Sequence, residues 1–519
     1  MPSKQHLLRR SMVVGSFSFL GSLTGILVEI TIAAHLGLSR NSDTFYIAYT
    51  VPYIITNLIS ATGQFSLVPF FSSLEEEADS IAQNLWQGLS YALNLVALGL
   101  VILAVAGTLL APWVIRGIAP GFTASQSQMS AQLARWLFFV IVPAGVAEVF
   151  RSFLFSQHRF ALGSAAGFFR NVSVIAFIVF GFHRYGDYSI VMGYFAGYLA
   201  QVSILGGQVF WSFPVRYRWM LRGLGKASHR LHGAGASQIA SALGWQAVVL
   251  VERIIASFLP PGTITALNYG FKIMTTIAEL VAGSIGTSSL PALSRAFARE
   301  DEAIERKTFQ DAIEITLVLL SPIAVCCLVL PHPIMQLVFQ RGNFSSAATG
   351  RMAFIFFCYS LSLLPFSGLR LLNFYLFARH EMKVFLGLSA LYTGAVAGLD
   401  LLYVMVLHWG AKGIPLALLT SLGIIGLTVY SKNLAGIRRF FNRELGALAG
   451  KDLIASLLAA IVIWRLSGWI HAPQSSRGLL LFLCVVCGIG CAVFLAVMIG
   501  WRAISASQIL KILERPAHG

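Results

Sequence analysis

The chain alternates between long apolar runs and short polar connections along its whole length. Each run holds about 20–30 residues, the length of a membrane-crossing helix, and lacks the ~10-residue alternation of a membrane strand. Only helices and closed barrels can span a bilayer. The pattern therefore predicts an all-α, polytopic membrane protein with about 14 transmembrane helices. The expected spans are 11–37, 43–73, 86–116, 131–157, 160–182, 188–213, 234–259, 263–294, 310–340, 349–378, 383–408, 412–436, 450–470 and 478–502.

Composition supports this prediction and limits the possible partners. Hydrophobic residues make up 57% of the 519 positions and charged residues only 11%, too few to cover a soluble protein of this size. The net charge of +16 is typical of polytopic membrane proteins, which collect Lys and Arg in cytoplasmic loops. No polar segment is long enough for a nucleic-acid-binding domain, so we expect no nucleic-acid partner.

The motifs of catalysis and metal binding are absent from the sequence. Cys484 and Cys487 have the spacing of a redox or metal motif, but their neighbours are apolar and offer no other ligand. We expect these cysteines to pack as small residues between helices. There is no Walker A motif, metal-binding cluster or nucleophile elbow, and the loops are too short to build an active site for a lipid-modifying enzyme. We therefore predict that the protein is not an enzyme and uses no cofactor or metal.

A repeat with a spacing of 222 residues runs through most of the chain. The aromatic stretch 42–69, which contains Asp43 and Pro52, has a relative at 264–291. The matched pairs are Ile55 and Ile277, Leu58 and Leu280, Ser66 and Ser288, Pro69 and Pro291, Phe122 and Phe344, and the segments 154–158 and 376–380.

The repeat predicts two six-helix halves, residues 1–221 and 222–443. Because six is even, both halves begin on the same side of the membrane, and the repeats are parallel. Residues 444–519 have no counterpart and are expected to form two additional helices and a short cytoplasmic tail.

Positive charge is concentrated in alternate loops. The terminal segments and loops that are rich in positive charge contain Lys4, Arg9, Arg10, Arg216, Arg218, Arg222, Lys226, Arg230, Arg295, Arg299, Arg306, Lys307, Lys432, Arg438, Arg439, Arg443, Lys451, Lys511 and Arg515. The positive-inside rule then predicts that both termini are cytoplasmic. Two helical halves without a soluble domain are typical of a secondary transporter, with its site near midplane and alternating access as its mechanism.

Ionisable residues within the spans are the candidates for that site. Each costs roughly 2.5–3.5 kcal/mol at a helix centre, so it normally faces a polar cavity. Glu148 and Arg151, at i and i+3, are expected to neutralise each other, and Arg170 is expected to reach the headgroups from a span end. Capping of the second span is an alternative role for Asp43. The predicted substrate cavity contains Glu29, Asp43, Lys272, Glu279, Arg253 and Arg370.

Several segments resemble the MurJ (MviN) family of lipid II flippases, within the multidrug/oligosaccharidyl-lipid/polysaccharide exporter superfamily. They are GSLTGILVEITIAAHLGLSRNSDTFYIAYTVPYII near the N-terminus, ATGQFSLVPFF, APWVIRGIAPGF, LNYGFKIM, GTSSLPALSRAFA, VFQRGNF and LFARHEMK. The resemblance implies a protein of the bacterial inner membrane that serves peptidoglycan synthesis, cell-wall biogenesis and cell shape. Its substrate would be an undecaprenyl-pyrophosphate sugar, with membrane lipids and a coupling ion as further partners.

The chain departs from the family's pattern in the first helices. The family's first helix carries two arginines where this sequence has Ser22 and Val28, while the adjacent acid is kept as Glu29. Thr56 replaces a further arginine, and Lys272 stands where the family has Arg. A lysine offers a point charge in place of a guanidinium fork. Either another arginine substitutes, for example Arg253 or Arg370, or the substrate differs. The alternatives are a flippase for O-antigen or exopolysaccharide units, a cation-coupled drug exporter, and a non-transporting membrane scaffold.

Overall fold

A computed structural model describes residues 4–76, 81–213, 217–221, 236–440, 443–470, 472–473 and 475–501. Every regular element in these ranges is a helix, which confirms the all-α fold. The elements, with η marking π or 3-10 turns, are α1 Lys4–Leu36, α2 Arg40–Thr62, η1 Gly63–Leu67, α3 Val68–Glu76, α4 Ile81–Ile118, α5 Ala124–Ser156, α6 Phe160–Tyr185, α7 Tyr188–Ser212, α9 Ala236–Ala256, α10 Thr263–Ala278, η2 Glu279–Gly283, α11 Ser284–Ala298, α12 Glu302–Val329, α13 Pro331–Phe339, α14 Ser346–Ser360, α15 Leu363–Ala378, α16 Met382–Asp400, η3 Leu401–Val406, η4 Gly410–Lys412, α17 Gly413–Ser431, η5 Leu434–Phe440, α18 Arg443–Trp469 and α19 Ser476–Gly500.

The described residues contain 11 helical segments that are long and apolar enough to cross a membrane, or 12 when the pair α14–α15 is counted as one span bent by 47°. The expected number of about 14 is therefore not confirmed. The predicted second span is divided among α2, η1 and α3, and the predicted seventh span corresponds to α9. Neither qualifies as a span by length and hydropathy among the described residues.

Both copies of the repeated stretch are interrupted by a π-helical turn. In the first copy η1 separates α2 from α3, and in the second η2 separates α10 from α11. A carboxylate lies against a glycine of each turn, because a Cβ on Gly63 would meet Glu148 and a Cβ on Gly283 would meet Glu279. Such π turns are frequent at functional sites, so these breaks point to the same stretches that the repeat singled out.

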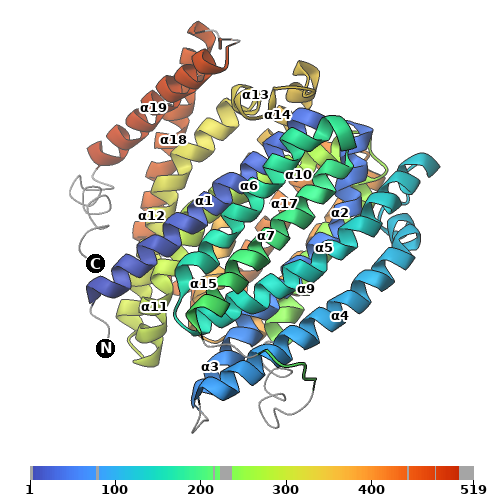
Figure 1. The fold of residues 1–519 in the computed structure, drawn as a ribbon. Helices are drawn as coiled ribbons and strands as arrows, with labels where there is room; N and C mark the ends of the chain where they lie inside the picture. Colours follow the sequence, from blue (N-terminus) through green and yellow to red (C-terminus); the bar gives the residue numbers. More distant parts are fainter. Residues whose placement is uncertain are drawn as a thin grey trace. The chain divides into compact units, whose positions relative to one another are not determined.

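The chain forms two compact units, Met1–Thr265 and Ala266–Gly519. In unit 1, α6 packs along α1 and α7, while α5 packs against α2, α4 and α7 (Figure 1). Helix α9 also belongs to unit 1, where it packs on α2 and α4. The division into duplicated halves 1–221 and 222–443 stays a prediction, because the bounds of compact units do not show whether a segment was duplicated.

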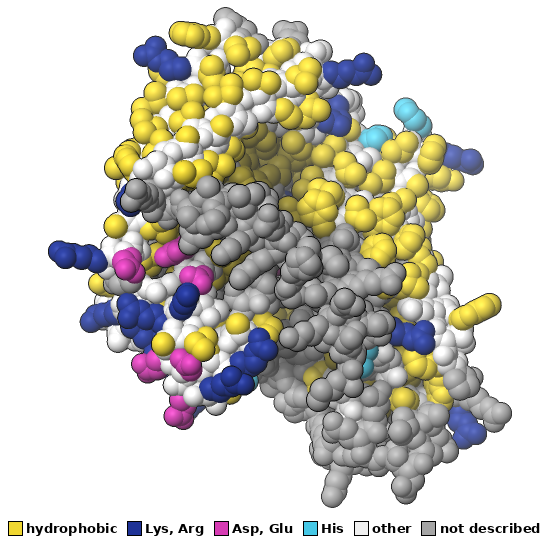
Figure 2. Space-filling model, turned by 90° about the vertical axis from the view of Figure 1, so that its left-hand side faces the viewer, with side chains coloured by type: hydrophobic (Ala, Val, Ile, Leu, Met, Phe, Trp, Pro, Cys, Tyr) yellow, Lys and Arg dark blue, Asp and Glu magenta, His cyan; other side chains and the backbone are white. Residues whose placement is uncertain are grey.

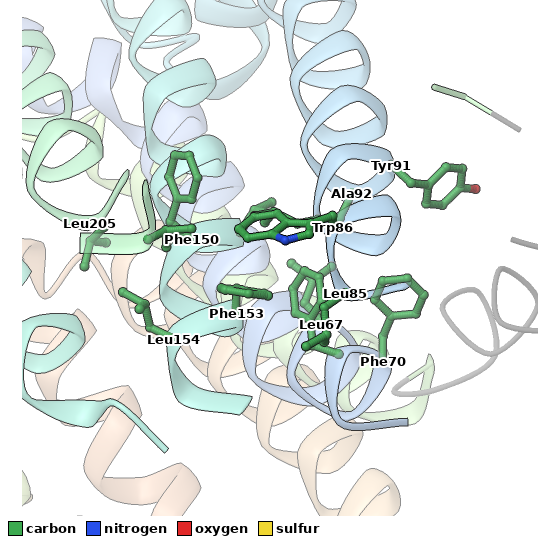
Figure 3. Close-up of a cluster of buried hydrophobic side chains, with 14 of the residues drawn as sticks. Leu67, Phe70, Leu85, Trp86, Tyr91, Ala92, Phe150, Phe153, Leu154 and Leu205 are labelled. Atoms are coloured by element: carbon green, nitrogen blue, oxygen red, sulfur yellow. The ribbon is translucent and has the colours of Figure 1, made fainter. Parts of the chain in front are cut away.

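The core of unit 1 includes an aromatic cluster around Phe153, drawn in Figure 3. Phe153 is fully buried and contacts Phe71 edge-on at 5.4 Å and Trp86 at 6.1 Å between ring centroids. The rings come from α3, α4 and α5, so burying them fixes these helices against one another.

Close packing in unit 1 depends on a glycine in α4. A Cβ on Gly107 would lie 2.4 Å from the buried ring of Phe138 on α5. We expect Gly107→Ala to lower the free energy of unfolding by about 1–3 kcal/mol, because overpacking forces the ring or the helix to move. Gly99→Ala on the same helix is the matched control, since its Cβ would meet open space. Thermal unfolding in detergent should separate the two variants, and equal midpoints would contradict this reading.

In unit 2, α12 packs against α11, α15 and α18, and α18 packs along α19 (Figure 1). A cluster of buried apolar side chains joins α12 to these last two helices, with Cys326, Cys487 and Cys491 among the packed residues. The expected packing role of Cys487 agrees with this position, whereas Cys484 is exposed.

Much of the protein's surface is apolar. Phe180 and Trp211 are 85% and 93% exposed, and yellow apolar side chains cover much of the described face in Figure 2, with acidic groups gathered at its lower left. Patches of this extent belong in a membrane or an interface.

Candidate functional site

A polar and aromatic cluster surrounds Glu29 inside unit 1. The Tyr46 hydroxyl donates to Oε2 of Glu29 at 2.5 Å, which connects α2 to α1. One helical turn along α2, the ring of Tyr49 lies 4.8 Å from that of Tyr194 on α7. Glu29 is half-buried, so the predicted cavity residue has a hydrogen-bonding and aromatic neighbourhood inside unit 1.

Arg170 of α6 supplies a guanidinium to the same region. It lies 5.1 Å over the ring of Tyr198 and donates to the Tyr198 hydroxyl at 3.4 Å. It also donates to Oδ1 of Asn171, whose amide donates to the carbonyl of Gly21 on α1. The expectation that Arg170 reaches the headgroups from a span end is wrong, because it lies ten residues into α6 and is held by tyrosine and asparagine.

Asp43 does not cap its own helix. Ser39 does so, because its side chain accepts from the backbone N–H of Ser42 in a capping box. The buried Asp43 carboxylate instead accepts from Gly262 N–H at 2.6 Å, Thr265 N–H at 2.9 Å and the Thr265 hydroxyl at 2.8 Å. Negative charge is favoured at a helix N-terminus, so Asp43 fastens the start of α10 to the start of α2.

Arg253 lies at the same junction. Its guanidinium donates to the carbonyl of Ile264 at 3.1 Å, one residue before Thr265. The structure thus brings together two of the predicted site residues, Asp43 and Arg253, around the turn that leads from α9 to α10. Both residues bind backbone groups of this turn, and Asp43 also accepts from the Thr265 hydroxyl, so both can position the chain here.

Three predicted site residues lie in unit 2. Glu279, the first residue of η2, forms an ion pair with Arg370 of α15, and the two side chains are 54% and 35% exposed. Lys272 lies two turns earlier on α10, half-buried. In the part of the chain that the structure describes, no carboxylate forms an ion pair with Lys272.

Two carboxylates of unit 2 escaped the sequence prediction. Glu305 is buried and accepts from Tyr375, Arg379 and Arg439 at 2.8, 2.9 and 2.6 Å. Asp452 on α18 accepts from Ser321 on α12 at 2.8 Å. The predicted spans placed Glu305 in a loop and Asp452 at a span end, so neither was treated as a membrane-embedded charge.

The predicted pair of Glu148 and Arg151 is confirmed, with 2.6 Å between carboxylate and guanidinium. Among the described residues, no group of three or more His, Cys, Asp or Glu side chains could hold a metal ion. The polar groups are therefore arranged for hydrogen bonding and ion pairing within an apolar helical bundle.

Such a bundle defines the protein as a polytopic helical membrane protein with polar groups in its interior. The family model described as Lipid II flippase MurJ matches residues 32–485, and the chain belongs to this family. It is accordingly a multi-pass protein of the bacterial inner membrane, in a family of transporters and not of catalysts.

Curated relatives and solved structures agree with this assignment. A probable lipid II flippase MurJ of Rhizobium meliloti is 25% identical over 98% of this chain and 97% of its own. The lipid II flippase MurJ of Burkholderia cenocepacia is 24% identical over 88% and 90%. A solved MurJ flippase in an inward closed conformation covers 95% of this chain and 100% of its own, with a TM-score of 0.77 at 18% identity. An inward-facing multidrug transporter of the MATE family shares the fold at a TM-score of 0.67 over 83% of this chain and 98% of its own.

Proposed function

We propose that the protein flips an undecaprenyl-pyrophosphate sugar of the lipid II kind from the cytoplasmic to the outer leaflet by alternating access, without chemical change to the substrate. The observation that carries the proposal is the match of residues 32–485 to a family of flippases, with relatives of nearly full length that bear this name. Both termini would be cytoplasmic, in keeping with the loop charges, and the duplicated halves would rock against each other.

The polar groups inside the units suit such a substrate. A sugar headgroup needs hydrogen-bonding partners, which Glu29, Tyr46 and Tyr49 offer, and a pyrophosphate needs cations. Arg170 lies near the same tyrosines in unit 1 and would replace the charge lost with Ser22 and Val28. In unit 2, Lys272 has no carboxylate partner among the described residues and is free to meet an anion.

Lys272 gives a direct test of the site. We expect Lys272→Ala to slow lipid II flipping in reconstituted vesicles by at least about tenfold, because the charged contact to the pyrophosphate is lost. Lys383→Ala, on an exposed lysine of the same unit, is the matched control and should flip at the wild-type rate. Wild-type flipping by Lys272→Ala in correctly inserted protein would remove Lys272 from the site.

Complementation tests the substrate. A strain depleted of its own lipid II flippase should grow when this chain is expressed. The missing arginines of the first helix favour a second candidate, a flippase for O-antigen or exopolysaccharide units. Failure to complement, together with rescue of a strain lacking such a polysaccharide flippase, would establish that candidate.

A further inference from the structure

Unit 1 has an apolar groove on its surface, and its lining shares no residue with the Glu29 cluster. Its volume is about 1060 Å³, and its walls come from α4, α5, α6 and α7. All lining side chains are apolar or aromatic, and several are open to the surroundings, including Trp136 at 61% and Leu199 at 44% exposed. A groove of this kind takes a hydrocarbon chain and offers nothing to a polar solute.

A second hollow of about 680 Å³ lies where α4 ends and α5 begins. Its lining is polar as well as apolar and includes Gln128, Gln132, Arg116 and Arg135. This hollow therefore has the chemistry of a site for a charged or hydrogen-bonding group.

The two hollows follow one another along the same face of α5. Gln128, Gln132, Arg135 and Phe139 are spaced by four, three and four residues, the spacing of one helical face. The first three line the polar hollow and Phe139 lines the apolar groove, so the groove continues the polar hollow toward the interior of the membrane.

The length of the groove along α5 matches the hydrocarbon thickness of one leaflet. Its lining on α5 runs from Trp136 to Val146, a distance of ten residue steps that rise ~15 Å at ~1.5 Å per step. Half of a ~30 Å hydrocarbon core is also ~15 Å. Trp136 of α5 and Tyr188, the first residue of α7, line the groove. Trp136 follows directly on Arg135 of the polar hollow, and amphipathic aromatic rings commonly mark a membrane–water interface.

The charge of the polar hollow is uncompensated. From residue 81 to residue 147 the only charged side chains are Arg116 and Arg135. Both are exposed, and no carboxylate in the described ranges forms an ion pair with either. Arg151, lower on the same helix, is neutralised by Glu148. Two guanidinium groups that line one hollow without a carboxylate partner suit an anionic phosphate in charge and in hydrogen-bond donors.

We propose that these hollows form one site for an anionic phospholipid, with its phosphate on Arg116 and Arg135 and an acyl chain in the groove. A zwitterionic lipid would bring its own cation to the two arginines, and a second copy of the chain would bring two more. Neither would complement the charge. The proposal concerns α4–α7 of unit 1 and does not depend on the flipped substrate.

The test uses the purified, delipidated full-length protein in neutral detergent, titrated with phosphatidylglycerol or phosphatidylcholine and read by native mass spectrometry. We expect phosphatidylglycerol to bind more tightly than phosphatidylcholine. The double variant Arg116→Gln/Arg135→Gln should lose that preference through at least about a tenfold loss of affinity. Arg184→Gln, at an exposed arginine outside the two hollows, should bind phosphatidylglycerol like the wild type.

A second variant tests the groove separately. Ala196→Trp fills the apolar groove that Ala196 lines and should weaken phosphatidylglycerol binding with both arginines in place. Equal binding of the two lipids, or wild-type binding by the double arginine variant, would overturn the headgroup assignment. If inorganic phosphate displaced the lipid at equal concentration, the acyl chain would contribute nothing to the binding affinity. If a polyprenyl phosphate bound more tightly than phosphatidylglycerol and depended on the two arginines, the site would be assigned to a prenyl lipid and not to a phospholipid.

Discussion

Glu305→Ala is expected to lower the free energy of unfolding by about 3 kcal/mol, because removing one member of a buried ion pair leaves its partners uncompensated. The Glu305 side chain is only 5% exposed and is shared by Arg379 and Arg439. These arginines come from the end of α15 and from η5. The single carboxylate thus holds three segments of unit 2 together, and its loss brings two like charges face to face.

The charged state of this cluster supports the size of the effect. Burial alone would lower the pKa of Arg379, but the Tyr375 hydroxyl and the carboxylates of Glu305 and Glu381 outweigh it and raise that pKa. The pKa of Arg439 is raised in the same way, against burial, by Tyr375 and Glu305. Both guanidinium groups therefore stay charged. Because they are 21% and 26% exposed, water can reach them, which places the loss at the lower end of ~3–5 kcal/mol.

Glu302 provides the matched control for Glu305. It lies one turn earlier on α12 and 3.5 Å from Arg439, but its side chain is 81% exposed. Such surface pairs contribute about 0–1 kcal/mol, so Glu302→Ala should leave the unfolding transition in detergent almost unchanged. Equal losses from the two variants would mean that Glu305 acts through surface electrostatics and not through the buried network.

The fold could be predicted because the bilayer imposes simple rules on the chain. A spanning segment must be apolar and helical, so the run 160–182 closely matches α6, and the run 131–157 ends with α5, which begins earlier, at Ala124. The breaks were harder to predict. The π turns at Gly63 and Glu279 each add one residue to a helical turn. In a uniformly apolar run, the spacing of apolar and polar residues does not reveal such an insertion.

The site could be predicted only where its contacts are local. Glu148 and Arg151 are three residues apart, and helix geometry alone brings them together. The pairing of Glu279 with Arg370 joins residues 91 positions apart and needed the structure. For Arg170 a signal was present, because a position ten residues into a span is too deep for a side chain to reach the headgroups easily. Its tyrosine partners, however, come from another helix.

Asp43→Ala is expected to lower the free energy of unfolding by about 2–6 kcal/mol, because each buried donor left without an acceptor costs roughly 1–3 kcal/mol. The substitution would orphan the N–H groups of Gly262 and Thr265, which both point at the carboxylate. Asp43 is 3% exposed, so water does not replace the lost oxygens without opening the junction. Thr265→Val removes only the hydroxyl donor and should cost about 1 kcal/mol.

Asp43→Asn separates the positioning role from the predicted cavity role. Asparagine keeps the volume and one acceptor oxygen but loses the charge and turns an NH₂ toward backbone donors. With three bonds already made to the start of α10, the carboxylate has little capacity left for a substrate. We therefore expect Asp43→Asn to lower the unfolding midpoint in detergent, while flipping per folded molecule in vesicles stays within about twofold of wild type. Flipping that falls tenfold with an unchanged midpoint would instead place Asp43 in contact with the substrate.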